Sequence, residues 1–268
     1  MHLDSTRDYR NITKSERQIY EEILAKGNTE RKFGRINHCN QYPEAVKNFL
    51  SLFPNNHICL YDMKRKNDLH SINLEFQKLI HDEATTEQDI LRFINHNPKA
   101  FHIIGSIFSA GGFTFGHHSA FLFPEFRLGN EYRADYLLIG SSSGGYEFIF
   151  IELEKSNGRV VLKDGHLGKV LRDGENQIVN WKKWIEGNFH TLQEFFNKEK
   201  SPQKPLPKEF CCFDNTRMHY VVVGGTREHY SEEMYRHRRS KLLESNIKML
   251  HYDNLFDYSE ELLERKTF

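Results

Sequence analysis

The sequence predicts an α/β fold in which a mixed β-sheet is flanked by helices and preceded by an N-terminal accessory region. Residues 120–128, 133–140 and 146–155 are rich in aromatic and β-branched residues and are separated by turn residues, which is typical of three successive strands. A helical pattern precedes these strands, and helical and strand-like segments alternate after them. This order predicts an antiparallel meander followed by helical crossovers.

The composition limits the class of protein. The 37 Lys and Arg residues balance the 37 Asp and Glu residues, so any nucleic-acid binding requires a local basic patch. The four cysteines form no Cys-x-x-Cys motif, which is typical of reduced thiols rather than of a zinc site. No apolar run reaches the roughly 18–20 residues of a membrane helix, and the first residues lack the pattern of a signal peptide. We expect a cytoplasmic protein without a membrane partner.

Residues 1–82 form the accessory region, which we expect to serve packing, regulation or self-association. The region is charged, its pattern is interrupted, and it carries no chemical motif. Apolar residues at helical spacing predict helices at 15–26 and 74–80, and a further helix is expected at 42–53. Residues 57–63 predict a short strand.

Residues 83–268 are predicted to form the main domain. Its first helix opens at Thr86 and Glu87 and stops before Pro98, because proline disfavours helical continuation. The remaining elements follow in order: a loop at 101–115, the three strands, a long connection at 156–172, a helix from about 173 to 187, a proline-rich linker at 202–207, a strand at 218–224, a helix at 231–245, a strand at 247–252 and a helix at 254–264.

Three carboxylates lie in the second and third strands. Asp135 is in the second strand, and alternation places Glu152 and Glu154 on one face of the third. A hairpin symmetric about its Ser/Gly turn pairs Gly140 with Glu147, and the same register sets Asp135 opposite Glu152. Directly opposed residues on neighbouring strands have Cβ atoms about 5 Å apart, so three carboxylates there repel one another. Their charge must be compensated by a cation, by a proton or by exposure to water. We favour a cation, and the alternative is an ordinary solvated strand face.

The order of elements, with aspartate on the second strand and Glu-x-Glu-Lys on the third, resembles the PD-(D/E)xK nuclease superfamily. About two-thirds of the chain is similar to the Shedu family of bacterial anti-phage nucleases. The pieces that carry the resemblance are Thr86-Glu87, Phe93-Ile94, Asn97-Pro98, Pro124-Glu125-Phe126-Arg127-Leu128-Gly129, Ala134-Asp135-Tyr136-Leu137-Leu138, Phe150-Ile151-Glu152-Leu153-Glu154-Lys155-Ser156, Gln177 with Trp181, Val222-Val223-Gly224-Gly225-Thr226, and Ile247 with Leu250-His251-Tyr252-Asp253-Asn254-Leu255.

The resemblance implies a restriction-endonuclease-like fold and a DNA endonuclease or nickase that acts on phage or plasmid DNA, including its ends. It also implies a homo-oligomer, either a dimer or a tetramer. The motif differs from the usual Glu-x-Lys, because Glu154 occupies the lysine position and Lys155 follows it; Ala134 replaces a proline. The alternatives are a catalytically inactive nuclease-fold module that binds DNA or regulates a partner, and an enzyme that acts on RNA.

Phosphodiester hydrolysis requires an activated water and neutralisation of charge on the phosphate, both of which Mg²⁺ (or Mn²⁺) provides. We expect Asp135, Glu152 and the backbone carbonyl of Leu153 to bind the ion. Glu154 is expected to hold a second ion or to act as general base for the water.

Other residues are assigned by resemblance. Glu87 is expected to reach the metal through water, and Gln177 with Trp181 is similar to a Gln-x-x-x-aromatic pattern that orients the metal site in RecB-type nucleases. Each has an ordinary alternative: Glu87 as an acid at a helix N-terminus, and the other two as surface and core residues of a helix. Lys155 is expected to contact phosphate or to be structural.

Basic residues in the long connection and the penultimate helix are candidate DNA contacts, and the alternative is a solvated face. His117, His118 and His166 are expected to be surface residues. The candidate phosphate contacts are Arg159, Lys163, Lys169, Arg172, Arg236, Arg238, Arg239 and Lys241.

Overall fold

The computed structural model describes residues 3, 7–27, 45, 49–96, 100–110 and 112–268. It contains a six-stranded sheet in the order β1 to β6, in which β1 to β4 run antiparallel to their neighbours and β4, β5 and β6 run parallel. The predicted α/β class with a mixed sheet flanked by helices is confirmed. The strands are β1 (His57–Ile58), β2 (Ser119–Leu128), β3 (Tyr132–Ser142), β4 (Gly145–Leu153), β5 (Met218–Val223) and β6 (Ile247–Leu250).

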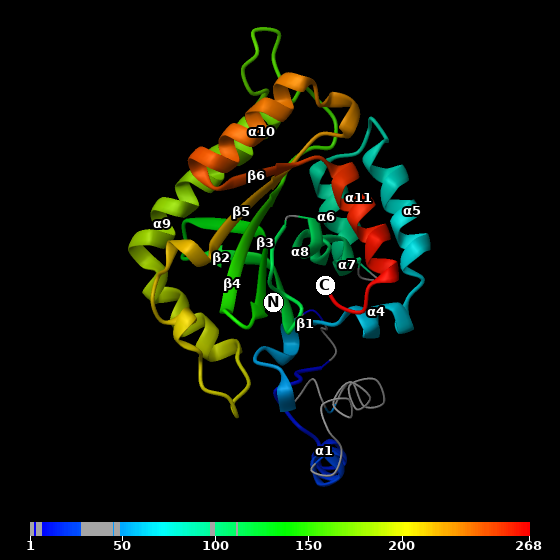
Figure 1. Ribbon diagram of the computed structural model, residues 1–268, viewed down its shortest axis with the longest axis vertical. Helices are drawn as coiled ribbons and strands as arrows, with labels where there is room; N and C mark the ends of the chain where they lie inside the picture. Colours follow the sequence, from blue (N-terminus) through cyan, green and yellow to red (C-terminus); the bar gives the residue numbers. More distant parts are fainter. Residues whose placement is uncertain (1–2, 4–6, 28–44, 46–48, 97–99, 111) are drawn as a thin grey trace.

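Helices cover both faces of the sheet (Figure 1). The long helix α9 (Lys169–Glu199) packs on one face, over a core rich in phenylalanine. A group of shorter helices packs on the other face, and α10 (Glu232–Ser245) lies against the edge strand β6. The shorter helices are α4 (Leu60–Lys66), α5 (Leu69–Ile80), α6 (Glu87–Asn95), α7 (Phe101–Gly105), α8 (Ile107–Ala110) and α11 (Tyr252–Glu261).

The strand pattern places the ends of three parallel strands at one edge of the sheet. Because β4, β5 and β6 run in the same direction, their carboxyl ends lie side by side. Glu152 is the penultimate residue of β4, and Glu154 is the first residue beyond it. The acidic pair therefore lies at the edge where α/β sheets commonly carry their functional sites.

Several predicted helices are confirmed, and one is longer than predicted. The helix expected at 15–26 is α1 (Lys14–Gly27), and the one expected at 74–80 is the longer α5. The helix expected at 173–187 is wrong in its extent, since α9 continues to Glu199. Gly187 does not end it, because the buried Phe189 and Phe196 beyond the glycine hold the helix on the core. Such packing outweighs the ~1 kcal/mol that a helical glycine costs.

Two local predictions are wrong. The loop expected at 101–115 contains α7 and α8. Every residue of α7 is buried, as are Ile107 and Phe108 of α8, so the segment shows no amphipathic period in the sequence. The strand expected at 57–63 is limited to β1, and α4 begins at Leu60. β1 is short because it pairs with β2 at two positions only. Half of the helix expected at 42–53 lies outside the described residues; of the rest, residues 45, 49 and 50 are helical and residues 51–53 are not.

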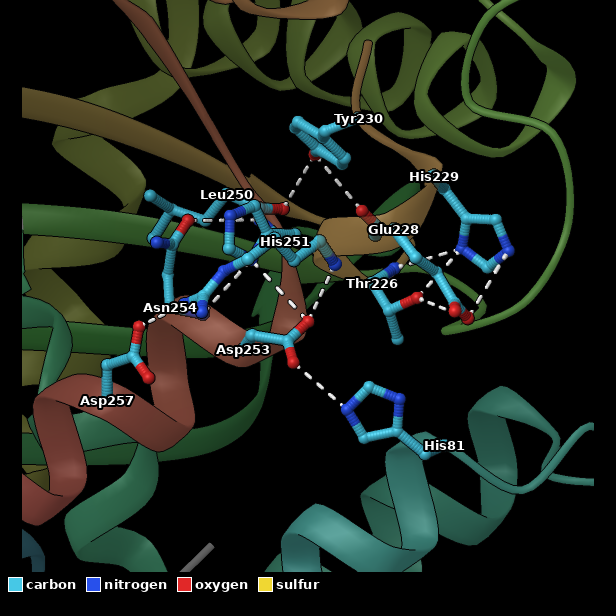
Figure 2. A network of polar contacts seen from close by, with 12 residues as sticks. His81, Thr226, Glu228, His229, Tyr230, Leu250, His251, Asp253, Asn254 and Asp257 are labelled. Atoms are coloured by element: carbon cyan, nitrogen blue, oxygen red, sulfur yellow. Dashed lines mark hydrogen bonds and ion pairs between the residues drawn. The ribbon is translucent and has the colours of Figure 1, made fainter.

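Part of the N-terminal region belongs to the same sheet and core as the rest of the chain. β1 extends the sheet, and the buried side chains of α5 share a core with α11. At the end of α5, His81 Nε2 lies 2.9 Å from Asp253 Oδ1 of α11, and Arg227 N donates to the other oxygen of Asp253 at 2.7 Å (Figure 2). Within the part of the chain that the structure describes, no helix is long and apolar enough to cross a membrane.

Candidate active site

Asp135 is held in the gap where β3 and β4 separate. The expected pairing of Gly140 with Glu147 is confirmed, and the paired ladder runs as far as Tyr136 opposite Ile151. Beyond that pair, Leu153 N donates to the carboxylate oxygen Oδ2 of Asp135 at 2.7 Å. The carboxylate accepts a backbone N–H, and this contact fixes it beside the end of β4.

Glu152 is a buried acid with one unsatisfied oxygen. The residue is 6 % exposed, and Gln177 Nε2 of α9 donates to its Oε1. Its Oε2 is buried and has no hydrogen-bond partner among the described residues. An orphaned carboxylate oxygen in a protein interior is costly unless a proton or a cation joins it.

Glu154 lies one residue beyond β4 and is anchored by its backbone. Glu154 N donates to Val223 O at 2.7 Å, and the hydroxyl of the fully buried Tyr252 donates to Glu154 O at 2.6 Å. Two glycines leave room for its side chain: a Cβ at Gly174 would lie 3.1 Å from Glu154 Oε1, and one at Gly224 would lie 3.2 Å from its Cβ. The structure therefore fits Glu154 between β5 and the first turns of α9.

The acids raise one another's pKa values. Burial, followed by the charges of Asp135 and Glu154, raises the pKa of Glu152 far above its ordinary value. Burial also raises the pKa of Asp135, although the hydrogen bond from Leu153 N opposes the shift. Burial and the nearby charge of Glu87 raise the pKa of Glu154 to about 8. At neutral pH the carboxyls therefore cannot all be ionised unless a cation compensates them.

The donor set suits a hard divalent cation. Mg²⁺ is commonly bound by one or two carboxylates and completes its octahedral shell with water and substrate oxygens. Asp135 and Glu152 provide two carboxylates, of which the second has a free buried oxygen. Among the described residues, there is no group of three or more His, Cys, Asp or Glu side chains placed to bind one metal ion. The arrangement thus fits an ion that is bound by two protein carboxylates.

The other predicted site residues lie in different surroundings. Glu87 begins α6, and burial raises its pKa while the charge of Lys155 lowers it. Lys155 is exposed, and its backbone carbonyl accepts from Gly225 N. Gln177 is exposed and reaches Glu152, whereas Trp181 is a fully buried core residue. Gln177 therefore contacts the acid cluster, whereas Trp181 packs in the core one helical turn further along α9.

The basic candidates lie on three segments: the connection after β4, the first turn of α9 and α10. The long connection after β4 packs against α10, where His237 Nε2 lies 2.6 Å from Gly165 O (Figure 1). Arg238 is half-buried and donates to Asn254 Oδ1 at 3.4 Å, and Lys241 forms an ion pair with Glu175. The exposed members are Arg159, Lys163, Lys169, Arg172, Arg236 and Arg239.

Sequence reasoning missed two residues that shape the site. Tyr252 holds the backbone of Glu154 across 98 positions of sequence, and no local pattern could signal such a contact. Glu125 has a φ of 49°, a left-handed conformation that is uncommon for a residue with a side chain, and its carboxylate lies 3.2 Å from Arg133 Nη1. The charges of Glu125 and Arg133 both act on Asp135.

Comparison with known proteins identifies the family. A family model described as Shedu protein SduA, C-terminal, matches residues 84–256, which is about two-thirds of the chain. The matched span contains Glu87, Asp135, Glu152, Glu154 and Gln177. A search of curated proteins finds no match. The chain therefore belongs to the Shedu family, whose SduA C-terminal region it shares.

Proposed function

We propose that this protein is a metal-dependent DNA endonuclease or nickase that acts in anti-phage defence. Membership of the Shedu family supports the defence role. The observation that carries the catalytic part is the buried, unpartnered Oε2 of Glu152 beside Asp135, at the carboxyl edge of the sheet. A bound Mg²⁺ or Mn²⁺ would supply an activated water and would neutralise charge on the phosphate.

Separate groups of residues would bind the metal ion, accept the proton of the water and bind the DNA phosphates. Asp135 and Glu152, with the carbonyl of Leu153, would hold the ion, and the amide of Gln177 orients Glu152. Glu154 would accept a proton from water as a general base, a role that its pKa of about 8 suits near neutral pH. The basic residues after β4 and on α10 bind phosphates of the DNA.

Cleavage of plasmid DNA and linear duplex DNA in Mg²⁺ or Mn²⁺ tests the proposal. We expect Asp135→Ala and Glu152→Gln to lower the cleavage rate on the order of 100-fold or more, because each removes a metal ligand. Glu147→Gln is the matched control: it removes a carboxylate from the same strand, and that carboxylate bonds His219 at 2.7 Å. A wild-type protein that leaves DNA intact, or an Asp135→Ala variant that cuts as well as wild type, contradicts the proposal.

A second candidate is a nuclease-fold module that binds DNA or a partner without cutting. It is favoured by the glutamate at the usual lysine position and by the absence of a ready three-residue metal cage among the described residues. Calorimetric titration with Mn²⁺ separates the two candidates. Binding that Glu152→Gln abolishes supports the nuclease, and the absence of binding supports the inactive module. RNA as a further substrate in the cleavage assay tests which polymer is used.

We also propose that the protein forms a homo-oligomer, as a dimer or a tetramer. The assembly expectation comes from the family resemblance, and two adjacent exposed leucines on α10, Leu242 and Leu243, are compatible with a surface that is covered in solution. Light scattering of the purified protein measures the mass directly. A monomer at all concentrations would contradict this proposal without affecting the catalytic one.

A further inference from the structure

Two arginines face each other across the β2–β3 hairpin. Arg127 and Arg133 are direct cross-strand partners, a position in which like charges destabilise a sheet. Both arginines are exposed, whereas their sequence neighbours Phe126, Leu128 and Ala134 are buried in the core. The arginines therefore share the outward face of the hairpin, and folding leaves their repulsion in place.

The protein compensates only part of this charge. Arg133 forms an ion pair with Glu125 at 3.2 Å, and its side chain stays 58 % exposed. Arg127 has no hydrogen-bond or ion-pair partner in the part of the chain that is described. A hollow of about 210 Å³ lies at the arginines and the turn that joins their strands. It is lined by Arg127, Gly129, Asn130, Glu131, Tyr132 and Arg133.

The hairpin holds the arginines at a fixed place near the acid cluster. Arg133 is two residues from Asp135, which corresponds to about 7 Å along a strand, and its charge acts on that carboxylate. The turn is packed against α9: Gly129 has a φ of 61°, and a Cβ there would lie 2.7 Å from the ring of Trp184. β1 pairs with β2 at Ala120 and Phe121, so no described strand pairs with β2 beside Arg127 on that side.

We propose that Arg127 and Arg133 form a phosphate-binding pair that holds the nucleic-acid backbone next to the phosphate positioned at Asp135. The planar guanidinium group binds phosphate oxygens through two parallel hydrogen bonds, and an anion between two guanidiniums converts their repulsion into attraction. The separation from Asp135 is about that of neighbouring phosphates along one strand. This inference rests on the proposed function, because it assigns a substrate contact to the same site.

Binding to duplex DNA in the presence of a chelator tests the pair. We expect Arg127→Gln and Arg133→Gln each to weaken binding and to reduce the slope of log K against log salt by about 0.9, and the double variant to reduce it by roughly twice that amount. In the DNA-free protein, Arg127→Gln should raise the melting midpoint by roughly 1–3 °C, because it removes the repulsion between the arginines and leaves the ion pair of Arg133 with Glu125 in place. A structural role would lower the midpoint instead.

Arg265→Gln is the matched control. Arg265 is 47 % exposed and lies 3.5 Å from Glu261, so it is also an exposed arginine beside a carboxylate, but it follows α11. It should alter neither the salt slope nor the midpoint. If wild-type protein binds and cuts DNA while the Arg127 and Arg133 variants keep the wild-type salt slope, the arginine pair is refuted and the nuclease stands. If wild-type protein neither binds nor cuts nucleic acid, both proposals fail.

Discussion

The acidic residues of the candidate site, Asp135 on β3 and Glu152 on β4, accept hydrogen bonds from neutral donors. Asp135 accepts a backbone N–H and Glu152 accepts a side-chain amide, and none of the three central carboxylates forms a salt bridge with a described residue. Hydrogen bonds alone do not repay the desolvation of several carboxylates in one place. The folded protein therefore keeps protons on them at neutral pH, or it exchanges the protons for a cation.

This exchange predicts a pH dependence of stability in the metal-free protein. A carboxyl whose pKa is raised on folding stabilises the fold at low pH, and the contribution is lost as pH rises through the folded pKa. For Glu154 the loss should occur between its ordinary pKa of 4.5 and about 8. We expect the melting midpoint in chelator to fall across this range, and Mg²⁺ or Mn²⁺ to restore it at the alkaline end.

Melting curves of wild type and Glu154→Gln at several pH values measure this effect. The variant cannot lose a proton at position 154, so its midpoint should fall less between about pH 4.5 and pH 8. A wild-type midpoint that rises with pH over this interval would show that the acids are not buried together.

At the scale of elements, α9 closes the site through its first turns. Gly174 lies where a Cβ would come within 2.8 Å of Val222 Cγ1 and 3.1 Å of Glu154 Oε1, while a Cβ at Gly187 would meet nothing. The two glycines of one helix therefore have different roles: the first lets β5 and Glu154 approach the helix, and the second has no contact that requires it.

The two glycines provide a matched pair of substitutions. Gly187→Ala should stabilise the protein by about 0.5–1 kcal/mol, because alanine is the better helix former. Gly174→Ala should destabilise it by about 1–3 kcal/mol and lower the cleavage rate, because the methyl group displaces Glu154. Urea unfolding and the plasmid assay measure both. Equal effects of the two substitutions would mean that α9 does not pack on Glu154.

The contact between α11 and β4 predicts a second effect. Tyr252→Phe leaves the buried carbonyl of Glu154 without its donor, which should cost about 1–3 kcal/mol and should slow cleavage because the strand end is no longer held. Tyr220→Phe is the control, since it removes the hydroxyl of another buried tyrosine, and that hydroxyl has no hydrogen-bond partner among the described residues. Urea unfolding measures the stability of both variants, and the plasmid assay measures their cleavage rates. A Tyr220→Phe enzyme that is also slower would argue against this role of Tyr252.

At the scale of the whole molecule, the acids and the basic surface meet at one end of the sheet. β4 ends in the acidic pair, the connection that follows carries Arg159 and Lys163, and α9 opens with Lys169 and Arg172. Because these segments follow one another in the chain, the acidic candidates for metal binding and the basic candidates for phosphate binding lie near the same end of β4. DNA drawn to the basic residues would have its backbone close to Asp135 and Glu152.

The shared core predicts the outcome of truncation. We expect a chain of residues 83–268 not to unfold cooperatively, because it lacks β1 and the buried Ile72, Phe76 and Ile80 of α5, which pack in one core with α11. A chain that begins at residue 51 retains these contacts and should unfold in a single transition. Circular dichroism melts of the two chains measure the difference. A stable 83–268 chain would support the predicted boundary after residue 82.

The sequence by itself determined the strands β2 to β6 and the β3–β4 register. Alternation of side chains and turn residues are local properties, so the pairing of Gly140 with Glu147 could be derived without coordinates. The motif pieces of residues 84–256 identified the family for a similar reason, since they are short and retain their order. These features depend on neighbours within a few positions of the chain.

Only the tertiary structure decided what surrounds the carboxylates. The burial of Glu152, its contact with Gln177 and the anchoring of Glu154 by Tyr252 all depend on segments that packing brings together. The helices α7 and α8 also escaped sequence reasoning, because all of α7 and the residues Ile107 and Phe108 of α8 are buried, and such a segment shows no amphipathic period. Desolvation and electrostatic coupling are set by the whole fold, and therefore the chemistry of the site cannot be derived from the order of the residues alone.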